Sequence, residues 1–397
     1  MSIQAFQWYN PTKLVVKHDA SSEIANYLAS DQIQSVLLIF GKESAKKIGV
    51  YDQVVSALKA KNIIIYELGG VRANPEIQIV CQGIDICRQN QIQAVLPLGG
   101  GSTFDTAKGI ACGALLPEEF KSERAWDIYE GKVKITKALP IYGVLTISAT
   151  GSEMNSGAVA QDDKQKKKYS FHSIHNFPKV SIVDPKLQSH LPWFQQVNGF
   201  VDAFMHIAEF VTNMEDTEEA ETTFALDISL LKSIIKAGNK LQLNTEDHVA
   251  RANFVWAATC ALNQVASIAM RGGCGATHFM EHAISAYDPS ISHGAGLGVV
   301  FPAFVRANGE RGLRLNTYDR MAKEIFNKAG WQGLIQGFQD QLKKWGHPTT
   351  LNELFGRQVE DNERKIIMDI YKQCPVCGHY TDFRLPDDIT ADTFKFM

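Results

Sequence analysis

The chain has 397 residues, with 40 Lys or Arg against 43 Asp or Glu, so its formal net charge is -3. This balance lacks the basic excess typical of nucleic-acid or anionic-membrane binding, and no run approaches the ~20 apolar residues of a membrane span. We therefore expect neither nucleic acid nor membrane as a partner. A chain of this length exceeds one ordinary hydrophobic core and predicts two domains.

The cysteines and the N-terminal sequence bear on the cellular compartment. Seven cysteines, an odd number scattered through a large chain, indicate reduced thiols rather than a disulfide framework. Cys374 and Cys377 form a single C-x-x-C, and a structural zinc site would require a second pair, so free thiols are the favoured interpretation. The first residues show no basic stretch followed by an apolar one, so no signal peptide is expected. Together these features favour a cytoplasmic protein.

Strand and helix patterns alternate through the first half of the chain. We expect strands at residues 13–17, 35–40, 63–66, 94–98 and 180–183, and helices at residues 21–28, 51–60 and 75–89. Continuous apolar runs such as residues 35–40 are typical of strands buried on both faces. The alternation predicts a parallel sheet in a Rossmann-like α/β domain. Pro97 is expected in the last residues of its strand, where the ladder ends.

Three segments that follow predicted strands could contact a nucleotide. Gly99 to Ser102 joins a strand to a helix, where glycines and free N–H groups can accommodate a pyrophosphate, although a plain tight turn is the alternative. Gly41 to Ser44 could meet the adenosine ribose, where an acid favours a free 2′-OH and a base favours a 2′-phosphate. Residues 145–153 carry several hydroxyls that could bind phosphate or the nicotinamide amide, or simply cap a turn.

From about residue 187 onward the periodicity is helical and strand signals nearly disappear. We expect helices at residues 198–212, 218–238, 247–270, 277–287, 296–307, 318–329 and 334–345. This pattern predicts an all-α second domain.

A carboxylate and several imidazoles in this helical region indicate a metal site. Asp202 and His206 stand four residues apart in an apolar segment, so one helix would aim both at the same point, and a buried Asp there needs a partner. Three further histidines fall within sixteen residues: His278, His282 and His293. Any one of them could be an ordinary core histidine, but together they favour iron(II) or zinc.

Motifs along nearly the whole chain resemble the iron-containing (group III, metal-dependent) alcohol dehydrogenases, especially their butanol dehydrogenase and aldehyde reductase branch. The segments that carry the resemblance are residues 10–12, 48–52, 74–75, 99–108, 149–155, 184–185, 198–204 and 278–298. The resemblance implies a dinucleotide-binding α/β domain (residues 1–186), a helical metal-binding domain (residues 187–397) and a reaction cleft between them, an architecture shared with dehydroquinate synthase. It also implies a homodimer.

The resemblance assigns four metal ligands, Asp202, His206, His278 and His293, for Fe²⁺ or Zn²⁺. His282 matches an additional histidine of the family that lines the cleft, as a proton relay or as a hydrogen-bond partner that orients a ligand. His278 and His293 stand one residue further apart than in the relatives, a difference that a turn at residues 288–290 could absorb. This difference leaves His282 as an alternative ligand.

The residues expected to contact the cofactor belong to the loops described above and to two further segments. They are Gly41, Lys42, Glu43, Ser44, Asn74, Gly99, Gly100, Gly101, Ser102, Asp105, Thr146, Thr150, Ser152 and Lys168. Many NADP-using relatives read Gly-Gly-Gly-Ser at positions 41–44, whereas NAD-preferring relatives carry an Asp near position 42. Its absence here favours NADP(H), and Glu43 is the opposing feature.

The expected reaction is hydride transfer between the nicotinamide C4 and a metal-bound primary alcohol or aldehyde of the butanol type. Phe204, Met205, Phe279 and Met280 could line an apolar substrate pocket or belong to the core. The alternatives are a zinc enzyme resembling glycerol dehydrogenase or dehydroquinate synthase, and a non-catalytic nucleotide-binding scaffold. A turnover assay separates the enzyme from the scaffold.

Overall fold

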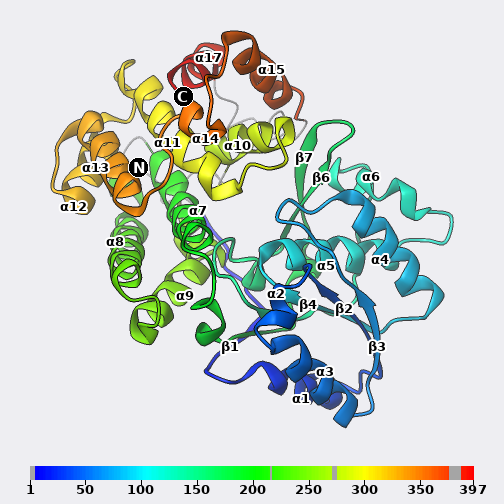
Figure 1. Cartoon of the computed structure of the whole chain (residues 1–397). Coiled ribbons are helices and arrows are strands. Elements are labelled where there is room, and N and C mark those ends of the chain that lie inside the picture. The colour runs from blue at the N-terminus through cyan, green and yellow to red at the C-terminus, as the bar shows by residue number, and fades with distance from the viewer. Residues whose placement is uncertain (1–4, 215–216, 271–274, 375–385) are drawn as a thin grey trace. The chain divides into compact units, whose positions relative to one another are not determined.

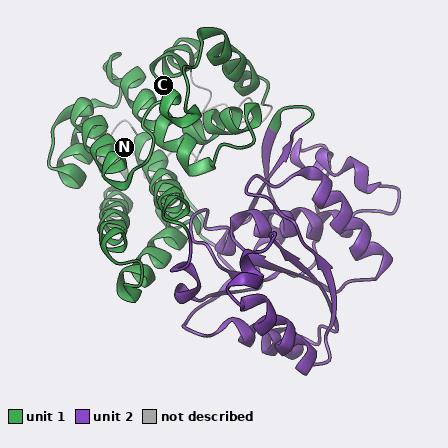
Figure 2. Ribbon diagram, viewed as in Figure 1, with its two compact units in different colours: residues 1–8, 164–167, 192–397 green, residues 9–163, 168–191 purple. Residues whose placement is uncertain are grey.

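The chain forms two compact units, which are distinguished by colour in Figure 2. The computed structural model describes residues 5–214, 217–270, 275–374 and 386–397. An α/β unit comprises residues 9–163 and 168–191, and a helical unit comprises residues 1–8, 164–167 and 192–397. The main segment of the helical unit thus begins at residue 192, shortly after the predicted domain boundary at 187.

Six parallel strands form the sheet of the α/β unit, in the order β1-β8-β5-β4-β2-β3 (Figure 1). They are β1 (Lys13–Val16), β2 (Ser35–Phe40), β3 (Ile64–Leu68), β4 (Ala94–Gly99), β5 (Tyr142–Leu145) and β8 (Val180–Val183). Every residue of β4 is buried, and so is every residue of β2 after Ser35, as their apolar runs predict. The predicted parallel α/β sheet is confirmed.

Helices cover both faces of this sheet. In Figure 1, α1 (Ile24–Ser30) and α3 (Val50–Ala60) lie on one face, whereas α4 (Ile77–Gln89) and α5 (Gly101–Ala114) lie on the other. Two shorter helices, α2 (Ser44–Lys47) and α6 (Trp126–Tyr129), complete the unit. The first face is held by a buried apolar cluster to which the helices contribute residues such as Leu28 and Val54. The alternation of strand and helix in the sequence therefore yields the expected layers.

Pro97 differs from its prediction, because it lies inside β4 between two neighbouring strands. It pairs with Ile39 of β2, and the ladder continues beyond it to Leu98. The residue two before it, Val95, donates its N–H toward β5, to Pro140 O at 3.1 Å. Alternate residues of a strand point their N–H groups the same way, so the donor that Pro97 lacks would face β5. The pairing between β4 and β5 accordingly shows a gap before Leu98.

A second, two-stranded sheet was not predicted. It consists of β6 (Gly157–Asp162) and β7 (Lys167–His172). Residues 163–166 form the turn between the two strands, and Lys167 and Lys168 belong to β7. Lys168 is buried there, although charge content alone suggests a solvated residue.

From residue 192 onward the described residues form helices and no strand, which confirms the helical second half. The helices are α7 (Trp193–Thr212), α8 (Glu221–Leu243), α9 (His248–Leu262), α10 (Ala276–Tyr287), α11 (His293–Gly309), α12 (Leu315–Phe326), α13 (Gly330–Trp345), α14 (Leu351–Phe355), α15 (Asp361–Lys372) and α17 (Asp387–Phe396). Helix α7 is buried on every face over residues 199–212. It packs against α8, α9 and α11, which places it at the centre of the unit. None of the described helices combines the length and apolarity needed to cross a bilayer.

One predicted helix is too long. Residues 247–270 were expected to form a single helix, but α9 ends at Leu262, and a short 3-10 turn follows at Val265–Ser267. Asn263 Oδ1 accepts a hydrogen bond from Val265 N at 3.1 Å, and Gln264 takes a left-handed conformation with φ of 80°. The asparagine thus offers the backbone a local bond that competes with the helix, which apolar periodicity does not reveal.

Candidate metal centre and nucleotide site

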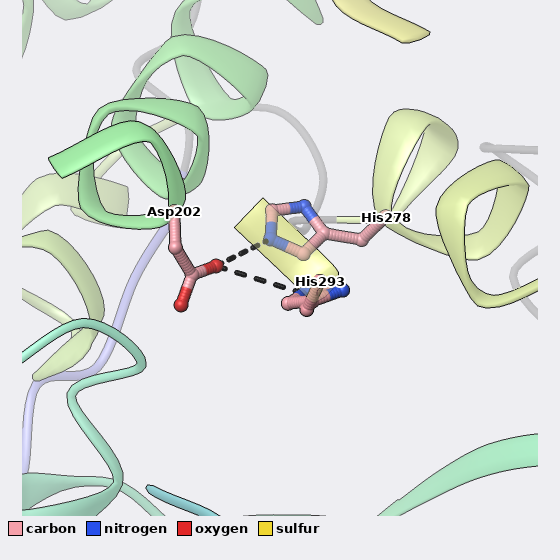
Figure 3. Close-up of side chains that lie close together, drawn as sticks. All are labelled: Asp202, His278 and His293. Atoms are coloured by element: carbon pink, nitrogen blue, oxygen red, sulfur yellow. Dashed lines mark ion pairs between the residues drawn. The ribbon is translucent and has the colours of Figure 1, made fainter. Parts of the chain in front are cut away.

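The carboxylate of Asp202 is surrounded by three imidazole nitrogens. Its Oδ1 lies 3.7 Å from Nε2 of His206, one turn later in α7. The same oxygen lies 3.6 Å from Nε2 of His278, in α10, and 3.6 Å from Nε2 of His293, the first residue of α11. Figure 3 shows the latter two side chains converging on Asp202 from separate helices. The four predicted ligands therefore come together in one place.

These separations fit a divalent cation. Ligand atoms about 2.0–2.2 Å from a tetrahedrally coordinated metal stand about 3.4 Å from one another. Asp202 Oδ1 is buried, and within the described part of the chain it accepts no hydrogen bond. Asp202, His278 and His293 each offer an atom within 4.8 Å of the others. A carboxylate oxygen and imidazole nitrogens suit Fe²⁺ or Zn²⁺, so the residues present fit the expected group.

Burial and mutual proximity set the protonation of Asp202 and His206. Burial acts to raise the pKa of Asp202, but the imidazoles of His206, His293 and His278 outweigh it and lower this pKa to about 2. Burial lowers the pKa of His206 to about 4, although Asp202 acts in the opposite direction. At neutral pH the carboxyl group is therefore ionised and the imidazole neutral, which are the states that bind a metal.

Two buried glutamates that were not predicted stand behind the histidines. Glu209 of α7 has Oε2 at 2.6 Å from Nδ1 of His278. Glu281 of α10 has Oε2 in contact with Nδ1 of His293. The sequence did contain a signal, because Glu209 follows Asp202 by seven residues, and Glu281 follows His278 by three, both helical spacings for one face. The sequence prediction considered only Asp202 and the histidines as site residues and did not use these spacings.

His282 lies on α10 one turn after His278. Its ring centroid is 5.3 Å from that of His293 and 5.8 Å from that of Phe279. Together with Glu281 and His293 it forms a second group whose ligand atoms lie within 4.8 Å of one another, so the alternative ligand role is sterically possible.

A turn joins α10 to α11 between His278 and His293, at the place expected to absorb a difference in length. Helix α10 ends at Tyr287 and α11 begins at His293. Between them, Asp288 Oδ1 accepts hydrogen bonds from Ser290 N at 2.9 Å and Ser290 Oγ at 2.6 Å. A self-bonded turn of this kind accommodates a change in length without altering either helix.

The apolar residues near the histidines belong to the core rather than to a pocket. Phe204 is 2% exposed, and Met205 and Met280 are fully buried within the apolar clusters of the helical unit. Phe279 is only partly buried. The interpretation of the first three as substrate contacts is therefore wrong, because their positions on α7 and α10 point them between packed helices.

In the α/β unit, two of the predicted nucleotide loops start side by side. Phe40, the last residue of β2, pairs with Leu98 of β4. The chain runs from β2 outward to β3 and then returns to the other side of β2 to form β4. Ligands of open parallel sheets bind at the carboxyl ends of strands where the order reverses in this way. The loops 41–44 and 99–102 both begin at this point.

The second of these loops leads into the N-terminus of α5. Its N-cap residue, Gly100, has no side chain that could cap the helix, which leaves the first N–H groups of α5 suited to an anion. A Cβ on Gly101 would stand 2.3 Å from Oγ1 of Thr150, so a glycine is also required by the close approach of the loop after β5. Ser102 Oγ donates to Ala73 O at 2.5 Å, next to the predicted cofactor residue Asn74.

Four buried polar side chains connect α5 to the loop after β5: Asp105, Lys108, Ser152 and Asn155. Ser152 Oγ donates to Asp105 Oδ1 at 2.6 Å, and Lys108 Nζ donates to Ser152 Oγ at 2.7 Å. Lys108 Nζ also donates to Asn155 Oδ1 at 2.9 Å and to Gly157 O at 2.8 Å. Burial lowers the pKa of Lys108 to about 8, against the effect of Asp105. Asp105 and Ser152 therefore bond within the protein, and their direct contact with a cofactor stays a prediction.

The remaining cofactor residues fall into two groups by exposure. Lys42, Glu43 and Ser44 are exposed, whereas Asn74, Thr146 and Lys168 are buried. Their exposure alone does not show whether they contact a cofactor, so their roles stay predictions.

The described cysteines form no disulfide. Cys81, Cys87 and Cys112 are free thiols. Burial raises the pKa of Cys81 to about 11 and that of Cys87 to about 12, so these thiols are unreactive. Cys377 lies outside the described residues, and the C-x-x-C interpretation stays a prediction.

Comparison with known proteins agrees with this geometry. The family "Iron-containing alcohol dehydrogenase" matches residues 11–185, and "Fe-containing alcohol dehydrogenase family, C-terminal" matches residues 196–372. The probable NADH-dependent butanol dehydrogenase 1 of Bacillus subtilis is 37% identical over 92% of this chain and 93% of its own. The NADPH-dependent aldehyde reductase YqhD of Escherichia coli is 35% identical over 75% of this chain and 74% of its own.

A solved structure shows the same fold. The NADH-dependent butanol dehydrogenase A of Thermotoga maritima superimposes with a TM-score of 0.89 at 35% identity, over 99% of this chain and 98% of its own. The C-terminal family match includes the segments that hold Asp202, His206, His278 and His293. The chain therefore belongs to the iron-containing alcohol dehydrogenase family.

Proposed function

We propose that the protein interconverts primary alcohols and aldehydes of the butanol type, with Asp202, His206, His278 and His293 as the metal ligands. The observation that carries this proposal is the single oxygen Asp202 Oδ1 with three Nε2 atoms at 3.6–3.7 Å. Membership of the family supports NAD(P)H-linked oxidoreduction of alcohols and aldehydes. Fe²⁺ or Zn²⁺ is the expected metal, because the donor set contains no thiolate.

A divalent ion at this site supplies Lewis-acid polarisation of the substrate oxygen. The protein's part is to hold three rings and one carboxylate in place and in the right protonation state. Asp202 is ionised and His206 neutral at physiological pH. We assign to His282 the transfer of a proton between the substrate hydroxyl and solvent, because it lies beside His293 without being needed in the set of four.

For the cofactor we propose NADP(H), bound by the loops at the carboxyl ends of β2 and β4. Lys42 supports this choice, since an exposed cation after β2 suits a 2′-phosphate. Relatives are named for both NADH and NADPH, so the preference requires a direct test. Steady-state rates with the two cofactors should favour NADPH, and Lys42→Ala should reduce that preference about tenfold by raising the KM for NADPH. A preference for NADH that disappears in Glu43→Ala would instead make Glu43 the determinant.

The test of the activity uses anaerobically purified protein. We expect about one iron or zinc per chain by elemental analysis and oxidation of NADPH in the presence of butyraldehyde. Asp202→Ala and His206→Ala should lose both the metal and turnover, whereas Asp52→Ala, on an exposed turn of α3, should keep both. Metal without turnover on any aldehyde would support the alternatives, a dehydroquinate synthase-like enzyme or a non-catalytic scaffold. Turnover in a metal-free Asp202→Ala protein would refute the ligand assignment. A cytoplasmic homodimer remains part of the proposal.

A further inference from the structure

Glu209 occupies an unusual position, because one buried carboxylate contacts both a ligand side chain and the end of the helix that carries it. It lies on α7 one turn after His206 and is 1% exposed. Its Oε1 accepts hydrogen bonds from Thr277 N, from Thr277 Oγ1 at 2.5 Å and from His278 N at 3.1 Å. Its Oε2 lies 2.6 Å from His278 Nδ1. Oε1 thus bonds to the N-terminus of α10, whereas Oε2 bonds to the ring of His278.

The first oxygen satisfies the N-terminus of α10. Helix α10 begins at Ala276, and its N-cap residue, Gly275, has no side chain that could accept these N–H groups. The first N–H groups of a helix have no partner within it, and leaving them buried without one is costly. By accepting from Thr277 and His278, Glu209 fixes where α10 starts relative to α7. That contact alone would make Glu209 a structural residue.

The second oxygen has a chemical consequence. An ionised carboxylate only accepts hydrogen bonds, so His278 must carry its proton on Nδ1 to bond with it. A neutral imidazole has one ring proton, so Nε2 is then left with a free lone pair. Nε2 is the atom that lies 3.6 Å from Asp202 Oδ1. The carboxylate therefore selects the form of the ring that can bind a metal at this point.

We infer that Glu209 is a positioning residue which holds His278 in the Nδ1-protonated form and aims Nε2 at the metal. It acts through His278 and touches neither substrate nor cofactor in this role. The inference rests on the proposed function, because it takes His278 as a ligand. It goes beyond that function by naming a residue that determines whether the ligand is available. His206 offers a contrast, since its Nδ1 has no hydrogen-bond partner in the part of the chain that the structure describes.

The substitution Glu209→Gln separates the two roles. The amide oxygen of Gln can still accept from the N-terminus of α10, so the helix keeps its cap. The amide nitrogen then faces Nδ1 and can only donate to it, which moves the ring proton to Nε2 and blocks the metal. We expect a folded protein whose Zn²⁺ affinity, measured against a competing chelator, falls about 10–100-fold, as is typical when the partner of a ligating histidine is removed.

Thr277→Val is the matched control. It removes one donor to the same carboxylate but leaves the Glu209–His278 bond and the backbone N–H bonds intact. It should lower the urea midpoint of unfolding, as loss of a buried hydrogen bond does, while Zn²⁺ affinity stays within about threefold of the wild type. A purely structural role for Glu209 predicts instead that both variants change stability and neither changes metal affinity selectively.

A spectroscopic readout needs no variant of Glu209. In the metal-free wild-type protein labelled with ¹⁵N-histidine, at about pH 8, His278 should show a protonated Nδ1 and an unprotonated Nε2. Its signals are assigned by their loss in His278→Gln. A proton on Nε2 in the wild type would overturn the inference even if Glu209→Gln failed to fold.

The outcomes separate the inference from the function on which it rests. A wild-type protein that binds no Zn²⁺ or Fe²⁺ would overturn the proposed function. A wild type that binds metal, together with Glu209→Gln that binds it equally well, would overturn only the role of Glu209. Selective loss of affinity in Glu209→Gln, with a ring proton that moves from Nδ1 to Nε2, would support it.

Discussion

Buried charged side chains mark the sites of both units, and Lys108 is the clearest case in the α/β unit. Its ammonium group donates to Ser152, Asn155 and Gly157 while the side chain is fully buried. Such a group holds the loop after β5 against α5, because a buried ammonium group without these acceptors would be costly.

We predict that Lys108→Met destabilises the protein by about 3 kcal/mol and weakens NADP(H) binding by about tenfold. Urea unfolding and fluorescence titration of the cofactor measure the two effects. Lys61→Met, at an exposed position, should change neither. Unchanged cofactor binding in a destabilised Lys108→Met protein would restrict this lysine to a structural role.

Asp227 of α8 is a second buried ionisable side chain, and it lies outside both candidate sites. It is fully buried, and neither carboxylate oxygen has a hydrogen-bond partner in the described part of the chain. Burial raises its pKa to about 9. In the unfolded chain an aspartate has a pKa near ~3.9, so the folded state binds the proton more tightly. The stability from this group is thus complete below about pH 4 and is lost progressively as the pH rises to about 9.

We therefore predict that Asp227→Asn flattens the pH dependence of stability. Relative to the wild type, its free energy of unfolding should rise by on the order of 1 kcal/mol per pH unit between about pH 5 and 8. Urea unfolding at several pH values tests this, with the exposed Asp52→Asn as the control. Parallel profiles for Asp227→Asn and the wild type would show that Asp227 finds a partner in solution.

At the scale of elements, the metal centre depends on how closely α7 and α11 approach. Gly294 follows the ligand His293, and a Cβ on it would stand 2.2 Å from the backbone oxygen of Asn198 on α7. Asn198 lies one turn before Asp202. Only a residue without a side chain allows this contact, because the obstacle is backbone rather than a flexible side chain.

Gly294→Ala should accordingly move α11 away from α7 and separate His293 from Asp202. We expect a loss of about 1–3 kcal/mol of stability from overpacking and a fall in Zn²⁺ affinity of at least about tenfold. Chelator competition measures the affinity. Cofactor binding serves as the internal control, since the nucleotide loops belong to the other unit. Normal Zn²⁺ affinity would mean that the helices adjust without moving the ligand.

At the scale of the whole molecule, metal binding should be coupled to unfolding. The proposed ligands come from α7, α10 and α11, so their arrangement exists only when these helices are packed. A metal that binds the folded state at a thousandfold excess over its Kd adds about 4 kcal/mol of stability.

Removal of the metal with a chelator should therefore lower the unfolding temperature measured by calorimetry, and added Zn²⁺ should restore it. Asp202→Ala, which lacks the central ligand, should unfold at the same temperature with and without chelator. An equal shift in the two proteins would point to metal binding elsewhere in the chain.

The sequence was sufficient for those features that depend on local patterns. Apolar runs such as residues 35–40 and the helical spacing of Asp202 and His206 report directly on burial and periodicity, so the parallel sheet and the helical second half followed from them. The resemblance to the family, carried by motifs along the chain, indicated the four ligands that the structure brings together.

Features that depend on contacts between distant segments required the tertiary structure. Pro97 lies inside a central strand because its missing N–H faces a short neighbour, and α9 ends early because Asn263 bonds to its own backbone. The roles of Glu209 and Gly294 depend on contacts with residues of other helices. The spacing of residues along the chain does not predict such contacts directly. The sequence alone thus determined the parallel sheet and the helical second half. Only the packing of α7, α10 and α11 decided which buried groups stand behind the predicted ligands, because burial and hydrogen bonding between helices are properties of the folded chain.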